Sequence, residues 1–174
     1  MKTNALILCA ALALTACAQP QFDRDGGVGA DAFGSGALGG AGAVVPGSAN
    51  DPTSAAYFQS QIGDRVLFAV DESTLSPDAR AVLDGQAQWL AANPAYTALI
   101  EGHADEQGTR QYNLALGGRR ANAARDYLIT RGVPAGRLRT ISYGKERPLE
   151  VCSVEACYAQ NRRAVTVLAV GAGV

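Results

Sequence analysis

GHADEQGTRQYNLALGGRRANAARDYL, residues 102–128, contains the strongest structural signals of this chain. The preceding residues, YTALIE at 96–101, have the composition of a strand, and the glycine that follows them ends it. Thr109 is a typical N-cap residue, and Gly132 is a typical C-terminal stop. We therefore predict a strand, a tight polar turn and one long helix over 109–131.

Arg120 lies in the middle of the apolar stripe of this predicted helix. The side chains of Leu116, Ala124 and Leu128 fall on the same helical face. A guanidinium on an inward face is unfavourable unless it is paired, and the nearest candidate partner is Asp105 in the polar turn. Two interpretations stay open. The two residues form a structural ion pair, or they lie apart across a groove and hold a ligand that carries both charges.

The first residues, 1–16, have the pattern of a bacterial signal peptide. A lysine is followed by an apolar run over 5–14 and by small residues before Cys17. The run is shorter than the roughly twenty residues that a membrane-spanning helix needs. LTAC at 14–17 resembles the lipobox, in which the cysteine is acylated after cleavage, and a plain secretory signal is the alternative. Several acyl chains on one residue anchor a protein durably. By the sorting rule of the lipoprotein class that this motif resembles, Ala18 rather than aspartate after the cysteine implies delivery to the outer membrane, so we expect a lipid anchor at its periplasmic face.

The next segment, 17–56, has the composition of a flexible tether. Nine glycines lie between Gly26 and Gly47, with few charged, aromatic or β-branched residues. Such a segment buries too little apolar surface to offset its ordering entropy. With roughly forty residues, its root-mean-square span is about 35 Å. The remaining residues, 57–174, are enough for one domain.

This domain carries thirteen Lys and Arg against twelve Asp and Glu, which argues against nucleic acid as a partner. Ser76, followed by proline and aspartate, predicts the start of another helix, and Asn93 with the next proline predicts its end. Residues 144–157 look like a long irregular connection. The predicted strands are 65–70, 96–101, 138–143 and 164–170. The order β-α-β-α-β-β predicts an α/β two-layer sandwich, with helices on one face of a mixed β-sheet.

The cysteines suggest a disulfide rather than a metal site. Cys9 is lost with the signal, Cys17 is the lipidation site, and Cys152 and Cys157 remain as a pair in an exported chain. His103 is the only histidine in the sequence, so a zinc site lacks ligands. We expect no metal and no cofactor.

The stretch 102–128, together with SYGKERP at 142–148 and NRRAV at 161–165, resembles the OmpA-like peptidoglycan-binding domain. The resemblance covers about 66–170. It implies that peptidoglycan is the ligand, through the free end of meso-diaminopimelate in its stem peptide. It also implies TolB and other Tol-system proteins as partners, with roles in envelope integrity and cell division. The ligand residues that it implies are Asp71, Asp105, Asn113, Leu116 and Arg120.

These residue types suit the implied ligand, which carries an ammonium and a carboxylate on one carbon. Arg120 can hold a carboxylate bidentately, and Asp71 and Asp105 can accept from an ammonium. Gly117 and Gly118 weaken the helix by roughly 1 kcal/mol each relative to alanine. Close approach of a ligand and packing of the helix on the sheet are both possible reasons for them.

The pair Arg162 and Arg163 is either a solvated charged pair or a contact at the rim of the site. We assign Arg163 as a secondary ligand contact, and we expect Asn161 to satisfy backbone groups near the last strand.

Taken together, these features predict a non-enzymatic tether between the outer membrane and the cell wall. One alternative is an OmpA-like wall-binding lipoprotein outside the Tol system. Another is a peptidoglycan hydrolase, but the sequence contains no nucleophile elbow and no HExxH-type motif. Release of soluble wall fragments distinguishes the hydrolase from the binding protein.

Overall fold

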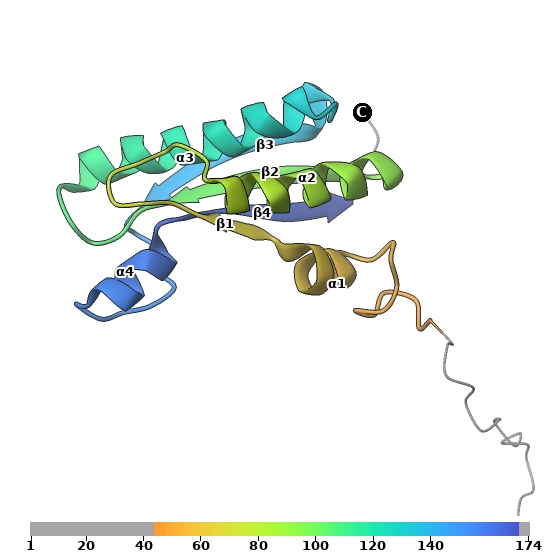
Figure 1. Ribbon diagram of the computed structural model, residues 1–174, viewed down its shortest axis with the longest axis horizontal. Helices are drawn as coiled ribbons and strands as arrows, with labels where there is room; N and C mark the ends of the chain where they lie inside the picture. The colour runs from red at the N-terminus through yellow and green to blue at the C-terminus, as the bar shows by residue number, and fades with distance from the viewer. Residues whose placement is uncertain (1–43, 171–174) are drawn as a thin grey trace, which may run out of the picture. The chain divides into compact units, whose positions relative to one another are not determined.

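The computed structural model describes residues 44–170, which contain a four-stranded mixed sheet covered by helices on one face (Figure 1). The sheet order is β1-β4-β2-β3. β4 pairs antiparallel with both β1 and β2, and β2 pairs parallel with β3. The strands are β1 (Arg65–Leu67), β2 (Tyr96–His103), β3 (Leu138–Gly144) and β4 (Arg163–Val170). This confirms the predicted two-layer α/β class.

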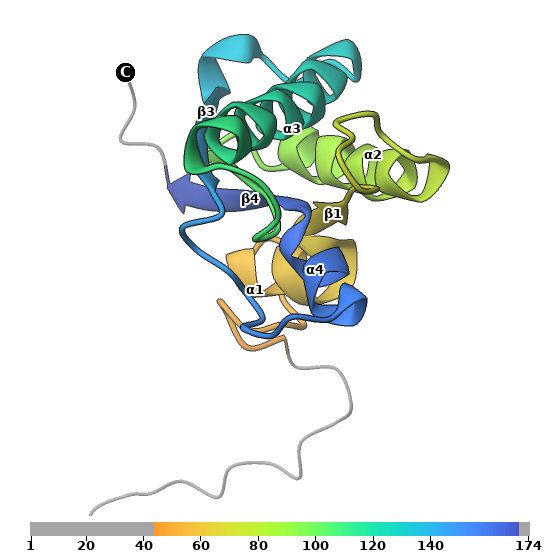
Figure 2. The same cartoon turned by 90° about the vertical axis from the view of Figure 1, so that its left-hand side faces the viewer.

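Two long helices form the second layer and lie beside each other (Figure 2). α2 (Pro77–Ala92) begins after Ser76, whose side chain accepts a hydrogen bond from the Ala79 amide at 3.1 Å. α3 (Arg110–Thr130) begins after Thr109, which accepts from the Tyr112 amide at 3.2 Å. Both caps are the ones that the sequence predicts. None of the helices in residues 44–170 is both long and apolar enough to cross a membrane.

The core lies between the two layers. In β2, Ala98 and Ile100 face the helices and are buried, because alternate residues of a strand point to the same face. They belong to the same apolar cluster as Leu83 and Leu90 of α2 and Leu128 of α3.

α3 crosses β2 at a contact between two glycines. A Cβ on Gly102 would lie 1.8 Å from the carbonyl oxygen of Gly117, and a Cβ on Gly117 would lie 2.5 Å from the hydroxyl of Ser142. The helix therefore approaches the sheet more closely than any side chain allows. For Gly117, helix–sheet packing is the explanation that the structure supports.

The region before β4 differs from the prediction. The predicted irregular connection 144–157 includes the start of a helix, α4 (Glu155–Asn161). Cys152 and Cys157 form the predicted disulfide. The strand predicted over 65–70 is also shorter, because the chain leaves the sheet after Leu67 and turns at Asp71, where φ is positive.

The compact unit begins before residue 57, where the composition placed the end of the tether. The indole N–H of Trp89 donates to the carbonyl of Pro52 at 2.7 Å, and Ser54 is buried. Three short elements also belong to this unit: α1 (Ala55–Tyr57), a π-helix, η1 (Phe58–Gly63), and a 3-10 helix, η2 (Ala135–Arg137). The predicted signal peptide, the lipidation site Cys17 and the tether up to residue 43 lie outside the described residues.

Candidate functional site

A pocket of about 270 Å³ lies beyond the end of β2, beside the first turns of α3. It brings together Asp71, Asp105, Asn113 and Leu116, which the sequence proposed as ligand residues. The full lining consists of Val70, Asp71, Asp105, Gln107, Gly108, Tyr112, Asn113 and Leu116.

Asp71 contributes its carboxylate from a tight turn, Ala69–Glu72. Its φ of 59° places it in the left-handed region, which residues other than glycine adopt rarely. The hydroxyl of Tyr112 donates to this carboxylate, and the bond raises the pKa of the Tyr112 side chain. Asp71 and Tyr112 thus form a hydrogen bond between the turn and α3 at the wall of the pocket.

Arg120 is completely buried and holds this turn in place. Its Nε donates to the carbonyl of Glu72 at 2.7 Å, and one terminal nitrogen donates to the carbonyl of Ala69 at 3.1 Å. The other terminal nitrogen donates to the carbonyl of His103 at 2.9 Å. Arg120 therefore bonds the backbone on both sides of Asp71 and joins the turn to the end of β2.

An Asp105–Arg120 ion pair, one of the two interpretations that the sequence left open, is absent from the described part of the chain, because the guanidinium of Arg120 donates to backbone carbonyl groups instead. Burial lowers the pKa of Arg120 to about 10, and the negative charge of Asp105 opposes that shift. The side chain stays charged at neutral pH and contributes a positive charge close to the pocket. Arg120 does not line the pocket, so a direct grip of a ligand carboxylate stays a prediction.

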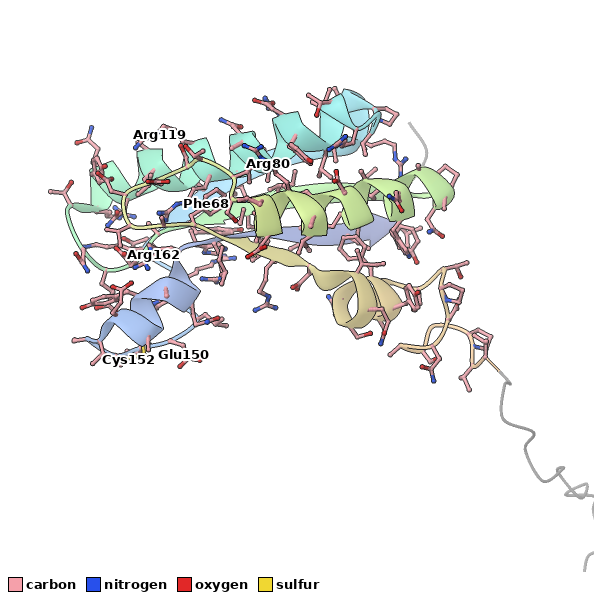
Figure 3. The ribbon with its side chains drawn as sticks, in the orientation of Figure 1. Phe68, Arg80, Arg119, Glu150, Cys152 and Arg162 are labelled. Atoms are coloured by element: carbon pink, nitrogen blue, oxygen red, sulfur yellow. A yellow bond between two sulfur atoms is a disulfide. The ribbon has the colours of Figure 1, made fainter. Side chains whose placement is uncertain are left out.

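The ion-pair partner of Asp105 is Arg162. Their side chains approach to 3.2 Å and both are buried, so Arg162 is not a solvated surface residue. Arg162 also bonds Glu155 at 2.5 Å and therefore links the pocket to α4. Figure 3 shows Arg162 at the end of α4 that faces the sheet. The second carboxylate oxygen of Asp105 accepts from the Gln107 amide at 3.2 Å, which shapes the loop.

Asn113 and Leu116 complete the wall from α3. The side-chain amide of Asn113 donates to the carbonyl of Gln107 at 2.8 Å and to that of Asp105 at 3.3 Å. Its role in this structure is to hold the loop that carries Asp105. Leu116 is buried and adds an apolar surface.

Arg163 does not line the pocket, although the sequence proposed it as a secondary contact. Its guanidinium donates to the carbonyls of Asn161 and Arg147, both at 3.3 Å, and burial lowers its pKa. The interpretation of Asn161 is confirmed. Its side chain accepts from the amides of Leu149 and Glu150 and donates to the carbonyl of Glu150.

Sequence reasoning missed Tyr112, and it selected Arg163 rather than Arg162 as the contact at the rim of the site. Tyr112 precedes Leu116 and Arg120 at steps of four, which places all three on one helical face, so its position was available from the spacing. Arg162 is 57 residues from Asp105, and no local pattern connects them.

Residues 44–170 contain no group of three or more His, Cys, Asp or Glu side chains that could hold a metal ion.

Comparison with known proteins gives a consistent result. The model of the OmpA family matches residues 67–162. A peptidoglycan-associated lipoprotein of Rhizobium meliloti (strain 1021) is 60% identical over 134 residues, which are 77% of this chain and 72% of the relative. That of Mesorhizobium japonicum is 51% identical over 168 residues, which are 97% and 92% of the two chains.

A solved structure shares the fold. The peptidoglycan-associated lipoprotein from Burkholderia pseudomallei matches with a TM-score of 0.62 and 39% identity, over 70% of this chain and 98% of that chain. The chain therefore belongs to the OmpA family. Within that family it is similar, over most of its length, to lipoproteins that are named for their association with peptidoglycan.

Proposed function

We propose that this chain binds peptidoglycan non-covalently and is not an enzyme. The observation that carries the proposal is the pocket in which Asp71 and Asp105 both present carboxylates beside the first turn of α3. Asp71, which accepts a hydrogen bond from Tyr112 and has no ion pair in the described residues, favours a cation. Asp105 adds acceptor oxygens, although Arg162 balances its charge, and the N-terminal end of a helix favours an anion. A ligand with both charges on one carbon matches this arrangement, and the names of the relatives support peptidoglycan as its source.

The ligand group is the free end of meso-diaminopimelate in the stem peptide. Asp71 and Asp105 accept from its ammonium, and Leu116 packs against its aliphatic chain. Its carboxylate lies toward Gly108 and the N-terminal end of α3, which favours an anion. The buried charge of Arg120, which interacts with Asp105 and Asp71, adds a positive potential to the pocket as a whole. Arg163 is not part of this proposed site.

Co-sedimentation with purified wall tests the site. Asp71→Asn removes the charge but keeps the conformation, because asparagine tolerates a positive φ. We expect affinity for meso-diaminopimelate wall to fall at least tenfold, about 1.4 kcal/mol, with an unchanged melting temperature. The matched control is Asp126→Asn, which changes an exposed carboxylate on α3 and is expected to leave binding unchanged.

Two results would contradict the proposal. The first is equal binding of wild type and Asp71→Asn. The second is equal binding of wild type to wall in which lysine replaces diaminopimelate, because lysine lacks the distal carboxylate. Release of soluble fragments during the same incubation would show a hydrolase instead.

The finer parts of the proposal concern anchorage and partners. Acylated Cys17 holds the chain at the periplasmic face of the outer membrane, so the domain tethers that membrane to the wall. TolB and other Tol-system proteins are the proposed partners, in envelope integrity and cell division. Binding of purified TolB to the domain tests this part, and a lack of binding would favour a wall-binding lipoprotein outside the Tol system.

A further inference from the structure

We propose, as an extension that rests on the proposed function, that Arg119 is a specificity-determining residue of the wall-binding site. Its guanidinium binds a second carboxylate of the stem peptide, separate from the one on the free end of meso-diaminopimelate. Three features of Arg119 support this role: its place beside the pocket, its lack of an ion pair in the described residues, and its distance from the N-terminal end of α3.

Arg119 lies next to Tyr112, which forms part of the pocket wall. The central guanidinium carbon of Arg119 is 5.8 Å from the centroid of the Tyr112 ring, within the range of a cation–π contact. The hydrogen bond to Asp71 raises the pKa of Tyr112, and the positive charge of Arg119 opposes that rise, so this charge lies close to the phenol oxygen. Helical side chains point back toward the N-terminus, so Arg119 extends along α3 toward the pocket.

The donors of Arg119 are available to a ligand. Its side chain is exposed, and Figure 3 shows it on the side of α3 that faces away from the sheet. It forms no ion pair with the residues that the structure describes. The other basic side chains around the pocket donate to backbone carbonyls or to carboxylates of the protein. These side chains are Arg110, Arg120, Lys145 and Arg162.

The position of Arg119 along the helix determines which ligand group it meets. The proposed site places the diaminopimelate carboxylate toward Gly108, at the N-terminal end of α3. Arg119 follows the N-cap residue Thr109 by ten positions, so at about 1.5 Å per residue its Cα lies about 15 Å farther along the helix axis. A single carboxylate cannot contact both places. Arg119 therefore binds a different anionic group of the same ligand.

The stem peptide supplies such a group. The residue before diaminopimelate is a glutamate that is joined through its side-chain carboxyl, which leaves its α-carboxylate free. A guanidinium binds a carboxylate through two parallel N–H bonds, so Arg119 fits this group. The pocket then recognises the end of the side chain of diaminopimelate, and Arg119 recognises the peptide that carries it.

Calorimetric titration of the full chain with three soluble ligands tests the proposal. They are free meso-diaminopimelate, the tripeptide L-Ala-γ-D-Glu-meso-diaminopimelate, and the same tripeptide with its glutamate α-carboxylate amidated. We expect wild type to bind the acidic tripeptide at least fivefold more tightly than the amidated one. Arg119→Gln is expected to abolish this preference and to leave the affinity for free diaminopimelate unchanged.

Arg125→Gln is the matched control, because it removes the same charge from the same helix at a position farther from the pocket. It is expected to keep the preference for the acidic tripeptide. The melting temperature of Arg119→Gln is expected to equal that of wild type, because the side chain is exposed.

Three outcomes would overturn the role of Arg119. If wild type binds the two tripeptides equally, or if Arg119→Gln keeps the preference, Arg119 does not read the second carboxylate and the proposed function still stands. An equal loss of affinity for all three ligands would show that Arg119 acts only through Tyr112 and Asp71. If wild type binds none of the three ligands, the proposed function fails as well.

Discussion

At the scale of single residues, Arg120 brings a full positive charge into the interior and satisfies it with backbone carbonyls. The bonds to Ala69 and Glu72 enclose Asp71, whose left-handed conformation needs support from its surroundings. Lysine has one ammonium and cannot reach three carbonyls in the geometry of a planar guanidinium. Arg120 therefore connects the stability of the domain with the shape of its pocket.

Arg120→Lys is expected to lower the free energy of unfolding by about 2–4 kcal/mol, because buried carbonyls lose their donors. Wall binding is expected to fall at least tenfold, because the turn that carries Asp71 is released. Urea unfolding and co-sedimentation measure the two effects. Arg125→Lys, at a partly exposed position of the same helix, is the control. A variant as stable as wild type would contradict the structural role, and loss of binding without loss of stability would favour a direct grip on the ligand.

His103 is the second buried polar residue with a measurable consequence. Its side chain is almost completely buried, and neither ring nitrogen has a hydrogen-bond partner in the described part of the chain. Burial lowers the pKa of His103 to about 4, and the positive charges of Arg163 and Arg147 add to the shift. The ring is therefore neutral near pH 7.

The stability of the domain is expected to fall as the pH is lowered from 6.5 toward 4. In that window the unfolded chain binds the proton of His103, because its ordinary pKa is about 6.5, while the folded chain does not. The contribution reaches about 3 kcal/mol at pH 4. Urea unfolding of wild type and His103→Phe across this range isolates it from the titration of the carboxylates. Identical pH slopes in the two proteins would contradict the assignment.

Residue types in the site could be predicted, but their partners could not. The spacing of Asp105 and Arg120 could place both near the end of β2, because a strand, a turn and a helix are local structures, but only Asp105 lines the pocket. The pairing of Asp105 with Arg162 depends on β4 lying between β1 and β2, which is a property of the sheet order. The carbonyl partners of Arg120 could not be predicted either, because every residue has a backbone carbonyl and the sequence does not indicate which of them accept from a given side chain.

At the scale of elements, the crossing of α3 over β2 determines how the helix carries its pocket residues. Gly102→Ala is expected to lower stability by more than about 3 kcal/mol, since its Cβ would lie 1.8 Å from a backbone oxygen. Gly118→Ala is the matched control, because its Cβ would lie 3.9 Å from its nearest neighbour. It is expected to stabilise the helix by about 1 kcal/mol. Melting temperatures of the two variants check the prediction, and equal effects would refute the close crossing.

Long helices were predictable because their first residues carry visible caps. Ser76 and Thr109 both accept bonds from the first turn, as their side chains suggest. α4 begins after Val154, whose side chain makes no capping bond, so no sequence signal marked its start. The shortened β1 has a similar cause. Phe68 still donates to the carbonyl of Arg162 at 2.9 Å, but the turn that Arg120 stabilises then takes the chain away from the sheet.

At the scale of the whole molecule, the anchor and the domain are expected to act independently. Cys17→Ser is expected to abolish acylation and recovery in the membrane fraction. The urea midpoint of the domain is expected to stay unchanged, because the apolar core between the sheet and the two long helices is built from residues of the domain itself. Metabolic labelling with a fatty acid measures acylation, and fractionation of cells measures recovery in the membrane fraction. A variant that stays in the membrane fraction after the wall has been digested would show that the anchor lies elsewhere.

The segment before α1 joins the compact unit toward the end of the sheet that lies away from the loop between β2 and α3 (Figure 1). Tension between a membrane-held N-terminus and a wall-held pocket would run along the strands. The hydrogen bonds between neighbouring strands would then be loaded in shear, and they would resist the tension together. Before the pull reaches β1, the bond between Trp89 and Pro52 takes up part of it. The mechanical load is in this way distributed through the sheet before it arrives at the turn that holds the ligand.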